Sequence, residues 1–263
     1  MKHGLQLAPF GHFSDPNRLV ELAQFAEESG WDGVFLWDHV LRLETRQISD
    51  PWVSLAAMAT VTQRIRLGTM VTPVSRRRPI KLALEVATLD RLSQGRITLG
   101  LGLGVDSGGE LTRFGEVVDP KERGDMLDEG ADLLSELLQG RTVDHHGPHF
   151  EVDGVGLDDP SVQQPRPPFW FATRGEARKP VRRAARFEGI FPIEADGDCF
   201  ARIVEEVATE RGDLDGFDIA IQAHPDGSVP DFVDRGATWI LQTWPALADP
   251  DDVAARVAAG PPR

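Results

Sequence analysis

Two polar residues stand directly behind a short apolar run in this chain. Residues 33–37 predict a strand, and Asp38 and His39 follow it without a break. In a barrel of parallel strands, residues at this end of a strand face the active site. A histidine there can transfer a proton or stack on a ring, and an adjacent carboxylate tunes it. The alternative is a simple turn, in which Asp38 caps the backbone and His39 lies on the surface.

A second candidate site lies between residues 169–172, which predict a strand, and residues 177–187, which predict a helix. Thr173, Arg174 and Gly175 connect the two elements. Backbone N–H groups at the start of a helix, together with an arginine and a flexible glycine, form a natural cradle for a phosphate group. A capped loop without any ligand would show much the same sequence.

The glycine run at Gly100, Gly102 and Gly104 ends another apolar stretch, residues 97–103. It is not a dinucleotide fingerprint, because that motif needs its third glycine three residues after the second, at a helix start. Two interpretations stay open. The glycines thin the barrel wall where a flat ring or an insertion packs closely, or they serve turn geometry alone.

Two other groups of charged residues are weaker candidates for a functional site. Arg76, Arg77 and Arg78 follow the strand expected at residues 65–71 and could reach an anionic ligand, although such a run is usually a solvated face. Glu194 and Asp196 follow the strand expected at residues 189–193. They suit acid–base chemistry, and they equally suit the capping of the next helix.

No metal site is predicted. His145, His146 and His149 are close in sequence, but no acidic or cysteine partner stands at ligand spacing, and residues 142–152 read as an exposed hairpin around a Gly-Pro turn. The single cysteine, Cys199, rules out an internal disulfide and is expected to be a partly buried helical residue.

The composition limits the function classes. The chain has 263 residues, of which 41% are hydrophobic and 27% charged, as is usual for a globular protein. A formal net charge of −14 argues against nucleic acid or an anionic membrane as partner. We find neither a leader pattern nor an apolar run of bilayer length, and we therefore expect a cytoplasmic protein.

Strands and helices alternate along the chain. Residues 65–71, 79–94 and 97–103 form one strand–helix–strand unit, in which Pro79 suits the first helical turn and Gly95 the stop. The eight expected strands span residues 3–8, 33–37, 65–71, 97–103, 169–172, 189–193, 217–222 and 238–243.

This count predicts an α/β fold, a single-domain (β/α)8 TIM barrel over residues 1–263 with an insertion after strand four. The insertion is expected to contain a polar, Gly-rich loop, a long helix at residues 120–139 and the hairpin. Further helices are expected at residues 200–211 and 250–258, with a short helical turn at residues 230–235. A doubly wound open sheet is the competing arrangement, but no nucleotide fingerprint follows the first strand.

Several stretches together resemble the bacterial luciferase-like monooxygenase family. They are AEESGWDGVFLWDH at residues 26–39, RIRLGTMVTP at 64–73, TLDRLSQGR at 88–96 and LGLGLG at 99–104, with a weaker match at 168–175 and 184–192. The family includes flavin-dependent monooxygenases and deazaflavin-dependent reductases and dehydrogenases. The resemblance implies the same barrel and, usually, a homodimer.

The resemblance also implies roles for single residues. The Asp38–His39 pair resembles the deazaflavin branch, in which the histidine lies near the reactive ring and helps protonation. The end of strand three in that branch often holds a non-proline cis peptide that backs the ring, which matches Met70–Val71 and adjoins Thr69.

If a flat ring packs against the thinned wall, Gly102 and Gly104 are expected to contact the cofactor. The resemblance itself matches Thr173, Arg174 and Gly175 to the loop that usually holds the cofactor phosphate.

Three departures from the family pattern stand out. Val105 replaces the glutamate that follows the glycine run in sugar-phosphate dehydrogenases of the branch, which argues against that activity. The chain has no tyrosine, so tyrosines used by flavin monooxygenases are missing. The segment after the seventh strand, often a long substrate-shaping insertion, is short.

The resulting prediction is an oxidoreductase that uses the deazaflavin coenzyme F420 and transfers a hydride between its ring and a small organic substrate. Catalysis is assigned to His39 with Asp38. One alternative is a monooxygenase that uses flavin mononucleotide (FMN) and a separate reductase. The other is a non-catalytic barrel subunit that binds flavin or has a structural role.

Overall fold

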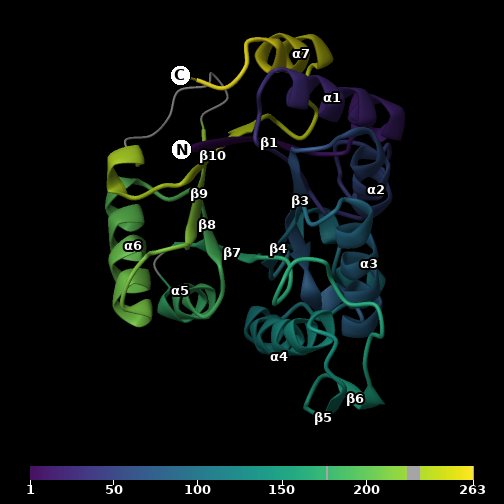
Figure 1. Cartoon of the computed structure of the whole chain (residues 1–263), viewed down its shortest axis with the longest axis vertical. Helices are drawn as coiled ribbons and strands as arrows, with labels where there is room; N and C mark the ends of the chain where they lie inside the picture. Colours follow the sequence, from purple (N-terminus) through teal and green to yellow (C-terminus); the bar gives the residue numbers. More distant parts are fainter. Residues whose placement is uncertain (176, 224–231, 263) are drawn as a thin grey trace.

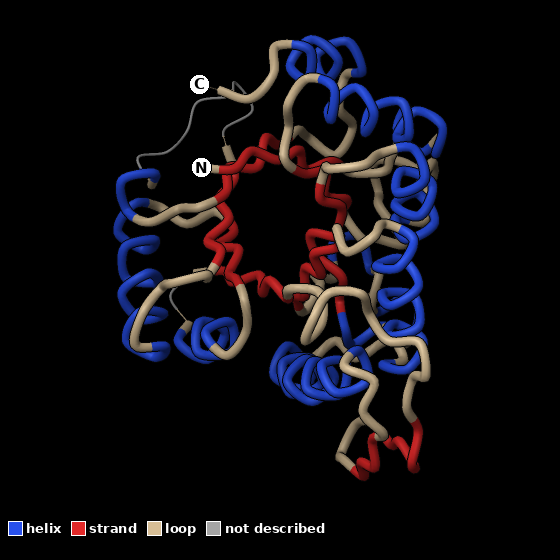
Figure 2. The backbone as a smooth tube through the Cα atoms, in the orientation of Figure 1, coloured by secondary structure: helices blue, strands red, loops and turns tan. Residues whose placement is uncertain are grey.

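A closed barrel of parallel strands forms the centre of the molecule. The computed structural model describes residues 1–175, 177–223 and 232–262, and in these residues eight strands close in the order β1-β10-β9-β8-β7-β4-β3-β2. Figures 1 and 2 look along the barrel and show the ring of strands with helices around it. The first and last strands pair, with Lys2 opposite Trp239, and so complete the ring. The predicted TIM barrel is confirmed, and closure excludes the open sheet.

The strands lie within one or two residues of the expected positions. They are β1 (Lys2–Leu7), β2 (Gly33–Leu36), β3 (Arg66–Pro73), β4 (Ile97–Gly102), β7 (Phe169–Arg174), β8 (Gly189–Ile193), β9 (Asp218–Gln222) and β10 (Trp239–Thr243).

The described ranges contain seven α-helices, most of which begin at a capping aspartate. They are α1 (Pro16–Glu28), α2 (Pro51–Val61), α3 (Pro79–Leu92), α4 (Pro120–Leu138), α5 (Arg178–Ala185), α6 (Gly197–Arg211) and α7 (Pro250–Ala258). The carboxylates of Asp15, Asp50, Asp119, Asp196 and Asp249 each accept backbone N–H groups at a helix start. Asp196 starts α6 three residues before the expected position, so capping is its role in this fold.

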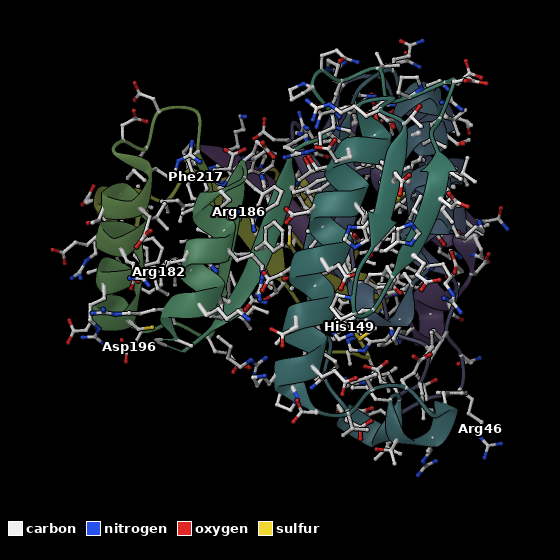
Figure 3. All side chains as sticks on the ribbon, turned by 90° about the horizontal axis from the view of Figure 1, so that it is seen from below. Arg46, His149, Arg182, Arg186, Asp196 and Phe217 are labelled. Carbon is white, nitrogen blue, oxygen red and sulfur yellow. The ribbon has the colours of Figure 1, made fainter. Side chains whose placement is uncertain are left out.

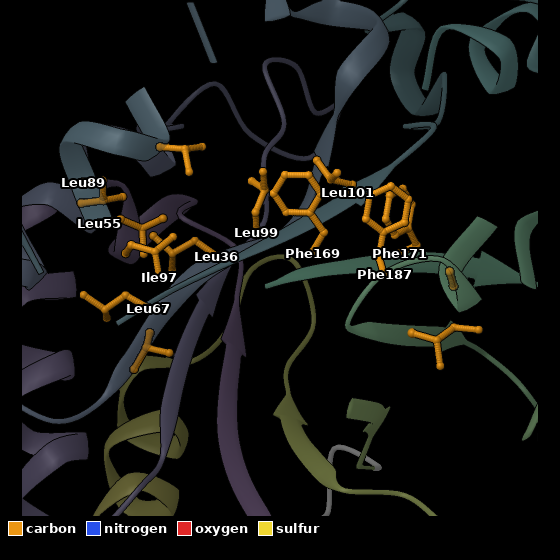
Figure 4. Close-up of a cluster of buried hydrophobic side chains, with 14 of the residues drawn as sticks. Leu36, Leu55, Leu67, Leu89, Ile97, Leu99, Leu101, Phe169, Phe171 and Phe187 are labelled. Carbon is orange, nitrogen blue, oxygen red and sulfur yellow. The ribbon is translucent and has the colours of Figure 1, made fainter. Parts of the chain in front are cut away.

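The larger core lies between the strands and the helices. Alternate residues of the strands point outward, among them Leu36, Leu67, Leu99 and Phe169, and all are fully buried. Figure 4 shows this layer continuing through Leu55 and Leu89 of the helices and through Phe187. Burial of this apolar layer is what holds the helices on the barrel.

A smaller core fills the barrel. It consists of the inward-facing residues Phe35, Met70, Trp170, Phe191, Ala220, Trp239 and Leu241. The rings of Phe35, Trp170 and Trp239 lie 5.3–5.8 Å apart, centroid to centroid. These rings close the interior below the carboxyl ends of the strands, so a ligand can bind only at or above that level.

The insertion follows β4, as predicted. Two 3₁₀ turns at Ser107–Gly109 and Thr112–Phe114 precede α4, and the hairpin β5 (Val143–His146) and β6 (Glu151–Val155) follows it. The hairpin extends beyond the ring of helices (Figure 1).

Of the turn expected at residues 230–235, residues 230–231 lie outside the described ranges and Val233–Arg235 form a 3₁₀ turn. Across the ranges described, no helix is both long and apolar enough to cross a bilayer.

Candidate functional site

Asp38 anchors three elements at the carboxyl end of β2. Its side chain is 1% exposed, and the carboxylate accepts hydrogen bonds from the Thr72 hydroxyl at 2.8 Å, the Arg77 guanidinium at 2.7 Å and the Trp52 indole at 3.3 Å. The donors come from β3, from the segment after β3 and from α2. These contacts make Asp38 a residue that positions its neighbour; the direct catalytic role expected for it stays a prediction.

His39 faces a carboxylate that our sequence reasoning missed. Its Nδ1 lies 2.7 Å from Oε1 of Glu110, and its side chain is 17% exposed while that of Glu110 is 1% exposed. The rings of Phe10 and Trp37 flank the imidazole at 6.1 and 5.8 Å between centroids. His39 therefore lies at the barrel mouth with its side chain fixed by Glu110, and it is not a surface histidine.

Glu110 reaches His39 because the start of the insertion folds back. The Asp106 carboxylate accepts hydrogen bonds from the Thr112 hydroxyl and from the backbone N–H groups of Leu111 and Thr112. These donors hold the pKa of Asp106 below its usual value. The Asp-Ser-Gly-Gly sequence at 106–109 is a turn signal, but it does not show which residue the turn presents to the barrel.

The arginines behind β3 correct an expectation. Arg76 bonds Oε2 of Glu110 at 3.2 Å and the backbone oxygen of Asp38 at 2.7 Å, and its side chain is only 5% exposed. Arg77 pairs with the Asp38 carboxylate. The guanidinium groups of Arg76 and Arg77 therefore neutralise buried acids and are not available to an anionic ligand. Arg78 is exposed and stands at the N-cap of α3.

The end of β3 carries the irregularity that the family resemblance implied. The Met70–Val71 peptide bond is cis, which confirms that prediction. The register between β3 and β4 shifts between Thr69 and Thr72, and Gln6 in β1 donates to the Met70 carbonyl oxygen at 3.1 Å. The hydrogen bond between Thr72 and Asp38 places this irregularity beside the end of β2.

The glycines of β4 make room for β3. A Cβ atom at Gly100 would collide with the backbone carbonyl of Thr69, and one at Gly102 would lie 2.6 Å from Cγ2 of Val71. A Cβ at Gly104 would lie 3.0 Å from Pro73. The thin-wall interpretation therefore accounts for Gly100 and Gly102, with the neighbouring strand as the group that approaches. Contact of Gly102 and Gly104 with a cofactor stays a prediction.

The loop after β7 has unused polar groups. Thr173 is 3% exposed, and its hydroxyl has no hydrogen-bond partner within the described ranges. The N-cap residue of α5, Ala177, supplies no side-chain cap, and Gly175 has φ +65° with nothing within 4 Å of an added Cβ. Arg174 at the rim pairs with Glu194 at 2.8 Å. A buried unpaired donor beside an uncapped helix start fits an anionic group such as a phosphate.

An open cavity of about 370 Å³ adjoins the His39 side chain. Residues of the segment between β2 and α2 line it, including Val40, Leu41, Arg46 and Ile48. This segment is joined to the chain just after β1 by an antiparallel bridge between Phe10 and Ile48.

The histidines of the hairpin have a structural partner. His145 Nε2 lies 2.9 Å from Glu129 of α4, which also accepts the backbone N–H of His149, and Figure 3 shows His149 beside that helix. In the described ranges no group of three metal-ligating side chains occurs. Cys199 is buried on α6, as expected.

Comparison with known proteins identifies the family. A family model described as luciferase-like monooxygenase matches residues 3–225. A coenzyme F420-dependent tetrahydromethanopterin reductase from Methanopyrus kandleri superposes with a TM-score of 0.78 at 18% identity, over 99% of this chain and 98% of that one.

Two further solved structures are similar. An F420-dependent secondary alcohol dehydrogenase, in complex with an F420-acetone adduct, has a TM-score of 0.75 at 21% identity, over 97% of this chain and 81% of that one. The monooxygenase RslO1 from Streptomyces bottropensis has a TM-score of 0.73 at 26% identity, over 85% of this chain and 71% of that one.

Proposed function

From the premise that the chain belongs to the luciferase-like monooxygenase family, and is thus an oxidoreductase, we propose that it uses coenzyme F420 to oxidise or reduce a small organic substrate. The observation that carries the proposal is the His39–Glu110 pair at the barrel mouth, which Asp38 and Thr72 tie to the cis peptide of β3. The likeness to two F420-dependent enzymes supports the cofactor.

His39 has the position of a proton donor and acceptor in this proposal. Bound F420 would supply or accept a hydride at its ring. With Nδ1 engaged by Glu110, the Nε2 atom of His39 is left for the substrate, and the rings of Phe10 and Trp37 flank the imidazole. For an alcohol substrate such a group is needed, because the alcohol oxygen must lose a proton as its carbon gives up a hydride, and the carbonyl oxygen gains one in the reverse reaction.

The chain has groups that fit the cofactor. The unpaired hydroxyl of Thr173, the open space at Gly175 and the uncapped start of α5 would hold the phosphate. Arg174 and Arg178 flank this loop in the sequence, and their side chains are 59% and 76% exposed. They could therefore contact the anionic tail of a cofactor whose phosphate is bound there. Thr69, Met70 and Val71 would back the ring.

A second candidate is an FMN-dependent monooxygenase served by a separate reductase. The 26% identity to the monooxygenase RslO1 favours it, because that identity is higher than the 18% and 21% to the two F420-dependent enzymes. FMN shares the ring shape and the ribityl phosphate of F420, so the same cradle would accept it.

Titration of the cofactor-free protein with F420 and with FMN tests the proposal. Tryptophan fluorescence reports binding, since the chain has six tryptophans. We expect tighter binding of F420, by an amount that shrinks at high salt, because its tail adds negative charge that Arg174 and Arg178 can screen. Tighter binding of FMN would support the monooxygenase. Binding of neither would support the non-catalytic subunit.

The variant Thr173→Val tests the phosphate cradle directly. It removes an unpaired buried hydroxyl, so the cofactor-free protein should keep its stability or gain about 1 kcal/mol. Affinity for F420 and for FMN should fall roughly 10-fold, as for loss of a hydrogen bond to a charged group.

The matched control is Thr72→Val, whose hydroxyl donates to Asp38, and this variant should lose stability. Unchanged cofactor affinity in Thr173→Val would remove Thr173 from the cradle.

A further inference from the structure

We infer that Glu110 is a positioning residue that keeps the proton of neutral His39 on Nδ1, so that Nε2 is the atom that exchanges a proton with the substrate. The assignment rests on the proposed function for its catalytic meaning. Its structural content, which nitrogen carries the proton, concerns the protein without cofactor.

The surroundings of Glu110 decide the direction of the hydrogen bond. Oε1 faces His39 Nδ1 at 2.7 Å, while Oε2 accepts from the Val40 backbone N–H at 3.3 Å and from Arg76 at 3.2 Å. An ionised carboxylate accepts hydrogen bonds and cannot donate one. The imidazole must therefore present an N–H at Nδ1, which leaves the lone pair on Nε2 when the ring is neutral.

The charges of the cluster balance without His39. Asp38 and Glu110 contribute two negative charges, and Arg76 and Arg77 contribute two positive ones within 4 Å of them. Glu85 lies 3.8 Å from Arg77 and has its own cation, Lys81, at 2.7 Å. Each carboxylate is 1% exposed, so an unpaired charge here would be costly. The four groups are therefore neutral as a set, and Arg76 supplies the positive partner of the Glu110 carboxylate without a contribution from His39.

The position of Glu110 suits this role and not only the anchoring of the insertion. Its carboxylate holds the imidazole from the side away from Nε2, and the described residues offer Nε2 no hydrogen-bond partner. The same carboxylate also fixes the backbone of the next residue, Val40. Rotation of the ring by 180° would break the 2.7 Å contact, so the orientation of His39 depends on Glu110.

Nuclear magnetic resonance of the cofactor-free protein tests the inference. Long-range ¹H–¹⁵N spectra distinguish the two neutral forms of a histidine, and the signal of His39 among seven histidines is assigned by its loss in His39→Asn. We expect the wild type to carry the proton on Nδ1. In Glu110→Gln the amide can donate to Nδ1, and we expect the proton to move in part or wholly to Nε2.

Kinetics add a second readout. With F420 and the small alcohol that the wild type oxidises fastest, Glu110→Gln should lower kcat at least about 10-fold with KM within about 2-fold, because orientation affects the chemical step more than binding. The pH profile of kcat should change shape, and Glu110→Asp should restore part of the rate.

Glu116→Gln is the matched control. It removes the same charge from the same insertion at a carboxylate that does not contact His39 in the described structure, and it should change neither spectrum nor rate.

A wild-type proton on Nε2 would overturn the inference, whatever happens to the variant. An unchanged His39 spectrum in a folded Glu110→Gln protein would also overturn it. If the proton is on Nδ1 and the protein binds neither F420 nor FMN, the proposed function fails while the assignment of the proton stands.

Discussion

Two adjacent residues divide the work at the end of β2. Asp38 is buried and saturated with donors from β3, α2 and the segment after β3, so it holds the strand end in place. His39 is the residue of the pair that keeps an atom free for a ligand. The carboxylate next to the histidine thus acts here mainly by joining the end of β2 to β3, to α2 and to the segment after β3, and a second carboxylate, Glu110, contacts the imidazole.

Removal of the His39 imidazole should separate chemistry from folding. We expect His39→Ala to lower turnover with F420 by roughly 100-fold or more, as loss of a general acid or base does. Melting and the circular dichroism spectrum should stay close to those of the wild type, because the ring is at the mouth and not in the main core. His146→Ala, at an exposed histidine of the hairpin, is the control. Turnover within a few-fold of wild type would exclude His39 from catalysis.

At the scale of elements, one carboxylate ties α1 to the start of β3. Glu27 lies near the end of α1 and accepts the backbone N–H groups of Gln63, Arg64 and Ile65 at 3.0, 2.6 and 2.8 Å. Burial opposes the charge, but the N–H groups of Ile65, Arg64 and Gln63 outweigh it and hold the pKa of Glu27 below its usual value. The attachment of the start of β3 to α1 therefore depends on the negative charge of Glu27.

The stability that Glu27 contributes should depend on pH. A carboxyl whose pKa is lower in the folded state stabilises that state above its unfolded pKa, and the contribution is lost as the pH falls through the folded pKa. We expect Glu27→Gln to cost about 1 kcal/mol at pH 7, a modest figure because the carboxylate is partly solvated. The difference from the wild type should shrink as the pH falls below the unfolded value near 4.5.

Urea unfolding at several pH values measures this difference, with Glu28→Gln as a control at an exposed neighbour on the same helix. A pH-independent difference would mean that the charge of Glu27 plays no part.

For the molecule as a whole, the tightest constraint on barrel closure lies between β3 and β4. The two strands approach so closely that Gly68 has no space for a Cβ next to Thr98, and Gly100 has none next to Thr69. We call this close contact between β3 and β4 the seam. The register between the two strands shifts within it, between Thr69 and Thr72, at the end of β3 that lies next to the site. Closure of the barrel and geometry of the site therefore depend on the same pair of strands.

Addition of one methyl group at this seam should test that dependence. We expect Gly100→Ala to destabilise the protein by roughly 2 kcal/mol or more and to lower the Tm by about 4–8 °C, because a backbone atom cannot move aside as a side chain can. Gly124→Ala, in α4, is the control, since its added Cβ would make ordinary contacts at 3.7 Å and 3.9 Å.

The control should be neutral or slightly stabilising, because alanine favours a helix. Equal melting of Gly100→Ala and wild type would show that the seam can widen.

The order and type of the strands and helices could be predicted from the amino-acid sequence. Alternating apolar runs, Asp-Pro helix starts and glycine stops are local signals, and local signals suffice where one strand or helix follows another. Eight strands in alternation with helices then leave few arrangements, of which the barrel is one. The place of His39 at the end of a parallel strand left a site residue and a surface turn both open, and the family resemblance favoured the site.

Contacts between side chains that are distant in sequence could not be predicted in this way. Glu110 reaches His39 across 71 positions, and Arg76 reaches Glu110 across 34, through a loop whose path no periodic pattern encodes. Charge alone could not distinguish an arginine that awaits an anion from one that neutralises a buried acid, and Arg76 and Arg77 are of the second kind. Burial makes that choice, because a carboxylate removed from water needs a partner, and the partner is whichever cation the fold brings within reach.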